Sequence, residues 1–103
     1  MTPSLDTNLI VEVDEDLLDL VPAYLQNQRD SLPELRAAVA RGDMATLRRA
    51  GHRLKGSALM YGFGELGELG AALEQGPLEE MEVLLARMEQ YLATVRYTGR
   101  PVS

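Results

Sequence analysis

The sequence predicts an all-α protein, an antiparallel up-down four-helix bundle, on three observations. Apolar residues recur at steps of three, four or seven along almost the whole chain, as one face of an α-helix requires. Short breaks that contain Gly or Pro separate these stretches, and short connections favour antiparallel neighbouring helices. The 103 residues are enough for one modest core, so we expect a single domain over residues 1–103.

The first helix is expected to begin after Asp14, a good N-cap, and to end near Arg41. Pro22 and Pro33 interrupt it, and because each proline removes a backbone donor we expect a kink or a split at one or both. Gly42 suits the left-handed residue that follows a helix. The apolar face of this helix comprises Leu18, Val21, Leu25, Leu32, Leu35 and Val39.

Three further helices follow from the same pattern. Asp43 is the N-cap expected for a helix over about 44–60, the next helix covers about 65–75, and the last covers about 78–95 after a Gly-Pro break. The residues expected to face inward are Leu47, Ala50, Leu54, Ala58 and Tyr61, then Leu66, Leu69 and Leu73, then Leu78, Met81, Leu85, Met88, Leu92 and Val95.

The two ends of the chain do not follow the helical pattern. Residues 9–13, LIVEV, are β-like, but a single such run has no partner strand. We expect residues 1–13 to form an N-terminal arm, either extended or as an early helical turn. Residues 97–103 are expected to form a flexible tail.

Composition excludes several classes of protein. The chain has no cysteine, so disulfides and cysteine-based zinc sites are excluded. No apolar run approaches the ~18 residues of a membrane span, and the N-terminus lacks the basic start and apolar stretch of a secretory signal. We therefore expect a cytoplasmic protein that does not enter a membrane.

The charge is unevenly distributed. The net charge is −6, yet Arg48, Arg49, Arg53 and Lys55 supply four of the ten positive charges. These four residues, the basic island, lie in a stretch without Asp or Glu between Asp43 and Glu65. Nucleic-acid binding requires a broad basic face, so we expect none. A small basic island suits one compact anion, or a partner with an acidic cleft.

The only histidine, His52, lies within this island. At ~100° per residue its side chain falls about 140° from the core stripe and projects into solvent. Arg48 lies one turn before it, and Lys55 and Gly56 lie one turn after it. Gly56 leaves empty space beside the ring, while Arg48 and Lys55 supply positive charge for an anion held on it. Leu59, also exposed nearby, is a candidate apolar contact for a partner.

Other chemistries at this histidine are disfavoured. Ser57 faces almost the opposite side of the helix, so a Ser-His-Asp triad is not indicated. No acidic residue lies within helical reach of His52, so a metal site is not expected. An exposed imidazole is largely neutral and nucleophilic near pH 7, and its surroundings favour a nucleophile that accepts a phosphoryl group.

Residues 52–74, HRLKGSALMYGFGELGELGAALE, resemble the motif of histidine-containing phosphotransfer (HPt) domains. The family pattern is H-x-L-K-G-S, a Gly five residues later, and an apolar helix that ends in Leu-Glu, here Leu73 and Glu74. One departure is Gly51, where Ala is usual, and we expect it to change only local packing. Gly67 and Gly70 are interpreted as sites of close helix packing.

The resemblance implies a phosphocarrier with no catalytic activity of its own. His52 would accept a phosphoryl group through Nε2 from a receiver phospho-aspartate and pass it to another receiver. Lys55 would neutralise the phosphoryl charge, with Arg48, and Gly56 would give access. Leu59 and Arg49 are the predicted docking residues. Mg²⁺ would come from the receiver, and the protein would act as a monomer with no cofactor.

Two alternatives stay open. The first alternative to the phosphocarrier is the phosphoacceptor domain of a chemotaxis-type histidine kinase, whose gene would continue into an ATPase domain. The second is a helical adaptor without chemistry. In an adaptor, a change of His52 would leave partner binding intact.

Overall fold

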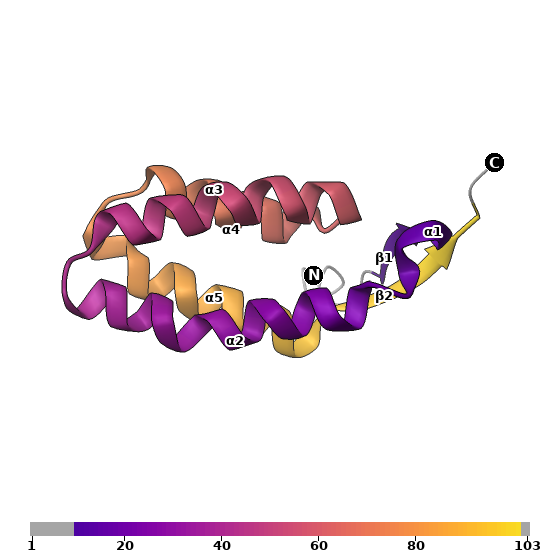
Figure 1. The fold of residues 1–103 in the computed structure, drawn as a ribbon, viewed down its shortest axis with the longest axis horizontal. Coiled ribbons are helices and arrows are strands. Elements are labelled where there is room, and N and C mark those ends of the chain that lie inside the picture. Colours follow the sequence, from indigo (N-terminus) through magenta and orange to yellow (C-terminus); the bar gives the residue numbers. More distant parts are fainter. Residues whose placement is uncertain (1–9, 102–103) are drawn as a thin grey trace, which may run out of the picture.

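The computed structural model describes residues 10–101. Its elements, in chain order, are β1 (Ile10–Asp14), α1 (Glu15–Leu18), α2 (Val21–Ala40), α3 (Met44–Tyr61), α4 (Gly64–Gln75), the 3₁₀ turn η2 (Leu78–Glu80), α5 (Met81–Thr94) and β2 (Arg96–Arg100). Figure 1 shows two layers of long helices, with α3 beside α4 and α2 beside α5. The mostly helical class predicted from the sequence is confirmed.

The prolines of the first predicted helix have different effects. The helix is split before Pro22: α1 ends at Leu18, and Pro22 lies in the first turn of α2, where its missing N–H has no intrahelical partner to lose. Pro33 lies inside α2, which runs without a break, and the kink predicted there stays a prediction. Asp14 is the N-cap residue of α1, as predicted, but its side chain makes no cap hydrogen bond.

The ends of α3 follow from local chemistry. The Asp43 carboxylate accepts a hydrogen bond from Thr46 N at 3.1 Å, which satisfies one free donor of the first turn and confirms the predicted N-cap. Gly42, just before it, has φ 69°, as predicted. At the other end Gly62 has φ 94°, and the N–H groups of Gly62 and Phe63 donate back to Ala58 O. The chain can therefore reverse directly into α4.

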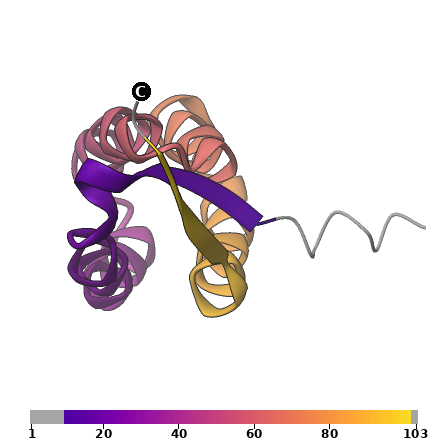
Figure 2. The same cartoon turned by 90° about the vertical axis from the view of Figure 1, so that its right-hand side faces the viewer.

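The N-terminal arm does have a partner strand, so that part of the sequence prediction is wrong. β1 pairs in parallel with β2, with Ile10 opposite Arg96 and Asp14 opposite Arg100. Figure 2 shows the two strands crossing one end of the helices. Residues 97–100, predicted as flexible tail, belong to β2. Residues 1–9 of the predicted arm and 102–103 of the tail lie outside the described residues.

This pairing escapes sequence reasoning because its two strands stand at opposite ends of the chain. Parallel strands need a long connection, and here the connection is the whole helical region. Val13 is fully buried, and the Phe63 and Tyr97 rings meet edge to face with centroids 6.3 Å apart. The Arg100 guanidinium forms an ion pair with Asp14. The strands are thus fixed both to each other and to the core.

The core lies between the helix layers and matches most of the predicted inward-facing residues. Leu78 is an exception: it is exposed because the last helix begins at Met81, after the η2 turn. The largest fully buried side chains are Phe63, Leu47, Leu66, Leu73, Met81, Leu85, Met88, Leu92, Val13 and Val21.

We predict that Gly62→Ala lowers the free energy of unfolding by about 1 to 3 kcal/mol, because a left-handed backbone is costly for any residue with a Cβ. The new Cβ would also lie 3.2 Å from Glu12 O. Gly64→Ala is the matched control: its Cβ meets nothing within 4 Å, and we expect no loss of stability. Urea denaturation of both variants checks this, and equal effects would contradict it.

Candidate functional site

His52 lies in the middle of α3, on the side away from the core stripe of that helix. Leu47, Leu54 and Ala58 of the same helix are buried, whereas the His52 side chain is 69% exposed. The outward projection predicted from helical rotation is confirmed. The imidazole is therefore available to a macromolecular partner.

The histidine is nevertheless not free, because α4 brings a carboxylate to it. Glu74 Oε2 lies 2.8 Å from His52 Nδ1. Sequence reasoning looked for acidic residues only along the same helix and missed this one. The signal in the sequence is Glu74 itself, the last residue of the motif in residues 52–74.

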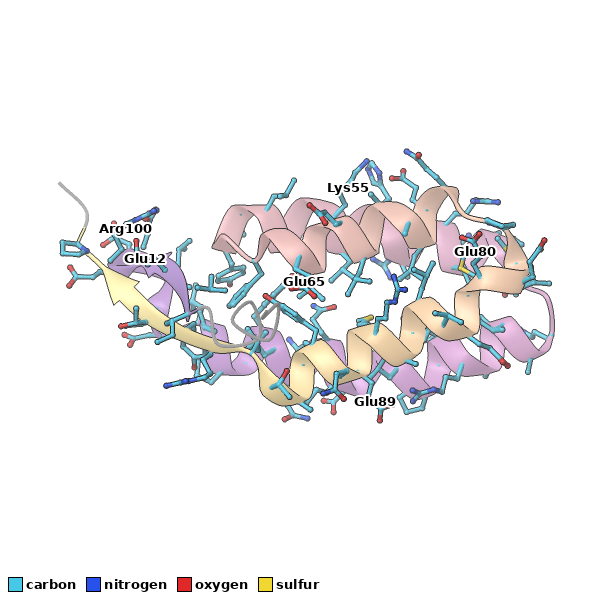
Figure 3. The ribbon with its side chains drawn as sticks, turned by 180° about the vertical axis from the view of Figure 1, so that it is seen from behind. Glu12, Lys55, Glu65, Glu80, Glu89 and Arg100 are labelled. Atoms are coloured by element: carbon cyan, nitrogen blue, oxygen red, sulfur yellow. The ribbon has the colours of Figure 1, made fainter. Side chains whose placement is uncertain are left out.

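Lys55 contacts the same carboxylate. Its Nζ lies 2.8 Å from Glu74 Oε1, so one glutamate bridges the histidine and the lysine that stand one turn apart on α3. The Glu74 side chain is only 24% exposed. Hydrogen bonds from Lys55 first, and from His52 second, hold the pKa of the Glu74 carboxyl below its usual value. In Figure 3, Lys55 lies on the outer side of the α3–α4 layer, away from α2 and α5.

The two arginines before His52 are placed differently from the lysine. Arg48 donates a short hydrogen bond to the backbone carbonyl of Glu74, near the C-terminus of α4, where carbonyls lack helical partners. Arg48 thus contacts α4, and its predicted contact with phosphate stays a prediction. Arg49 is exposed, and its Nη2 lies 3.4 Å from Thr46 Oγ1.

The space beside the ring is open. A Cβ built on Gly56 would meet no atom within 4 Å among the described residues. Leu59, one turn further, is 60% exposed, and Met60 is exposed next to it. The docking role predicted for Leu59 and Arg49 is not tested by this geometry and stays a prediction.

α3 is fixed to α2 behind the histidine. The Tyr24 and Ser57 hydroxyls lie 2.7 Å apart, and the Tyr24 ring stacks on Tyr61 with centroids 4.4 Å apart. Ser57 also donates to Leu54 O at 3.3 Å. Ser57 is thus a structural residue on the inner side of α3, as its helical position predicts.

The geometry defines what the imidazole can do. An ionised carboxylate only accepts hydrogen bonds, so the neutral ring donates through Nδ1–H to Glu74. Nε2 then carries the free lone pair. His52 lines neither of two hollows on the surface, one bordered by Asn27, Arg53 and Met88 and the other by Glu65, Arg87 and Tyr91, so its imidazole stands on an open surface. No group of three or more His, Asp or Glu within residues 10–101 is arranged to hold a metal ion.

The family model of the Hpt domain matches residues 10–98. The chain belongs to the Hpt domain family. No curated protein and no solved structure matches the chain. HPt domains are phosphocarrier modules of two-component phosphorelays and interact with receiver domains. This HPt domain therefore has a histidine phosphotransfer role in two-component signalling.

Membership of the Hpt domain family does not test every prediction made from the sequence. That residues 1–103 form one domain stays a prediction, as do the residues assigned to the site. Within the described part of this HPt domain, no helix is both long enough and apolar enough to cross a membrane.

We predict that Glu74 stabilises the HPt domain in a pH-dependent way. Its folded-state pKa is lowered, so the stabilisation is complete above its ordinary pKa of 4.5 and is lost as the pH falls through the folded value. The measurement is urea unfolding of the wild type and Glu74→Gln over a series of pH values. The difference between the two should shrink on acidification. Glu82→Gln controls for net charge, and a pH-independent difference would contradict the prediction.

Proposed function

We propose that this HPt domain relays a phosphoryl group between receiver domains on His52. The observation that carries the proposal is an exposed imidazole whose Nδ1 is hydrogen-bonded to Glu74. That arrangement leaves Nε2 as the nucleophile. The protein itself would act as a carrier, with no catalytic activity of its own.

The proposed step is a direct transfer of the phosphoryl group from the receiver aspartate to the His52 ring. The Nε2 lone pair attacks phosphorus, an N–P bond forms, and the P–O bond to the receiver aspartate breaks, which returns that carboxylate. The imidazole keeps its Nδ1 proton and becomes positively charged. Glu74 faces that proton at 2.8 Å and would stabilise the charge that develops on the ring. The reverse sequence, onto another receiver aspartate, regenerates the neutral histidine.

The surroundings of His52 suit this step. Phosphoryl transfer depends on positioning and on neutralisation of charge. Lys55 stands one turn away and would turn from Glu74 toward the phosphoryl oxygens, with Arg48 as a second cation. The open space at Gly56 would admit the phosphoryl group. We propose that Mg²⁺ is supplied by the acidic pocket of the receiver, which the basic island would meet.

The proposal also covers the topology of the helices, the oligomeric state of the domain and its location in the cell. We propose that α2, α3, α4 and α5 act as an antiparallel up-down four-helix bundle, supported by the contacts of α2 with α3 and α5 and of α4 with α3 and α5. We also propose that the domain works as a monomer in the cytoplasm. The absence of cysteine from the sequence fits the reducing conditions of the cytoplasm.

We predict that His52→Gln abolishes labelling. The wild type, mixed with a radiolabelled phosphorylated receiver and Mg²⁺, should acquire acid-labile phosphate, and the variant should acquire none. Arg87→Gln, an exposed change on α5, is the control. Equal labelling of His52→Gln would contradict the proposal. Labelling from a kinase and ATP but never from a receiver would favour the phosphoacceptor domain of a chemotaxis-type kinase.

We predict that Gly56→Leu slows transfer at least tenfold while the fold is kept. The added side chain occupies the space beside the imidazole, yet leucine in a helix is more stable than glycine by roughly 0.5–1 kcal/mol. Gly64→Leu, on another exposed glycine with open space, is the matched control. Transfer rates and urea midpoints of both variants check this. An unchanged rate for Gly56→Leu would show that access does not depend on this position.

A further inference from the structure

The backbones of α3 and α4 approach each other more closely at two glycines than side chains allow. A Cβ on Gly51 would lie 2.5 Å from Gly70 O, 2.6 Å from Glu74 N and 2.8 Å from Leu73 Cβ. A Cβ on Gly70 would lie 2.6 Å from Lys55 N and 2.8 Å from Gly51 O. Both glycines are buried. Gly51 therefore lies at a close packing contact, as predicted, and even one methyl group has no room there.

The same contact lies directly beside the phosphoacceptor. Gly51 precedes His52 in the chain, and Gly70 stands one turn before Glu74 on α4. The Glu74 backbone nitrogen is itself one of the atoms that a Gly51 methyl would strike. Three contacts of α3 with Glu74 depend on this approach: those of Arg48, His52 and Lys55.

We propose that Gly51 and Gly70 are positioning residues for His52, which set the distance between α3 and α4 at which Glu74 reaches the imidazole. The proposal rests on the proposed function of His52. To restore ordinary van der Waals separation after Gly51→Ala, α4 would have to move by about 1 Å. A 2.8 Å contact would then lengthen beyond hydrogen-bond distance.

The consequence is chemical rather than only structural. Without the carboxylate on Nδ1, the neutral ring is no longer held in the tautomer that exposes the Nε2 lone pair. The charge that forms on the ring during transfer also loses its partner. Lys55 loses the same carboxylate, since both side chains end on it.

Gly67 provides the matched control. It lies on α4 against α3 as well, but its Cβ would meet the Leu59 side chain, Cδ2 at 3.1 Å and Cγ at 3.2 Å, and would keep an ordinary 3.7 Å from the backbone at Lys55 O. Leu59 is exposed and can turn aside. Gly67→Ala thus adds the same methyl group to the same interface without displacing α4.

The first test needs no phosphotransfer. The chain has one histidine, so the ring nitrogens give a single set of NMR signals. In Gly51→Ala and Gly70→Ala, these signals should show loss of the Nδ1–H tautomer, and the pKa of the Glu74 carboxyl should rise toward its ordinary value. Gly67→Ala should match the wild type. Unchanged spectra in both glycine variants would overturn the positioning role, whatever the relay experiment gives.

The second test separates positioning from general damage. Transfer from a phosphorylated receiver should slow roughly 10- to 100-fold in Gly51→Ala, the scale of a 1 Å misplacement. In a Glu74→Gln background the same change should have little further effect, since Glu74 is the route by which Gly51 acts. Additive losses would overturn the proposal. Loss of the fold in both Gly51→Ala and Gly70→Ala would also overturn it, by showing that the contact is required for folding itself.

Discussion

The approach of α3 to α4 is the constraint on which the site around His52 depends. Where the two helices meet at Gly51 and Gly70, backbone lies against backbone with no side chain between them. This proximity lets a glutamate on one helix reach a histidine and a lysine on the other. The glycines weaken the propensity of each helix by about 1 kcal/mol per residue, and tertiary contact offsets that loss.

One carboxylate organises most of the charge near the histidine. Glu74 contacts two side chains of α3 through its two oxygens, and Arg48 binds its backbone carbonyl. Repulsion among the positive charges of the basic island is therefore partly offset, because α4 places the Glu74 carboxylate against His52 and Lys55. The far side of the imidazole faces solvent, so the same group that orients the ring does not block it. A site of this kind depends on a partner to enclose the reacting atoms.

The remainder of the fold holds α3 rigid behind this surface. The Tyr24–Ser57 hydrogen bond and the Tyr24–Tyr61 stack fix α3 to α2. At one end of the helices, β1 and β2 join the beginning and the end of the described chain (Figure 2). Phe63 links that sheet to the turn between α3 and α4 through its contact with Tyr97. Placement of the His52 side chain on a helix, rather than on a loop, limits its motion.

The sequence by itself determined the helices, the Asp43 cap, the left-handed Gly42 and the outward position of His52, because each depends on neighbours within a turn or two. Tertiary structure alone decided the β1–β2 pairing and the contact of Glu74 with His52. The paired strands stand at opposite ends of the chain, and the two side chains are 22 residues apart. Helical periodicity gives the face on which a residue lies but not which residue of another helix stands opposite. The close packing of α3 and α4 at Gly51 and Gly70 places Glu74 opposite His52.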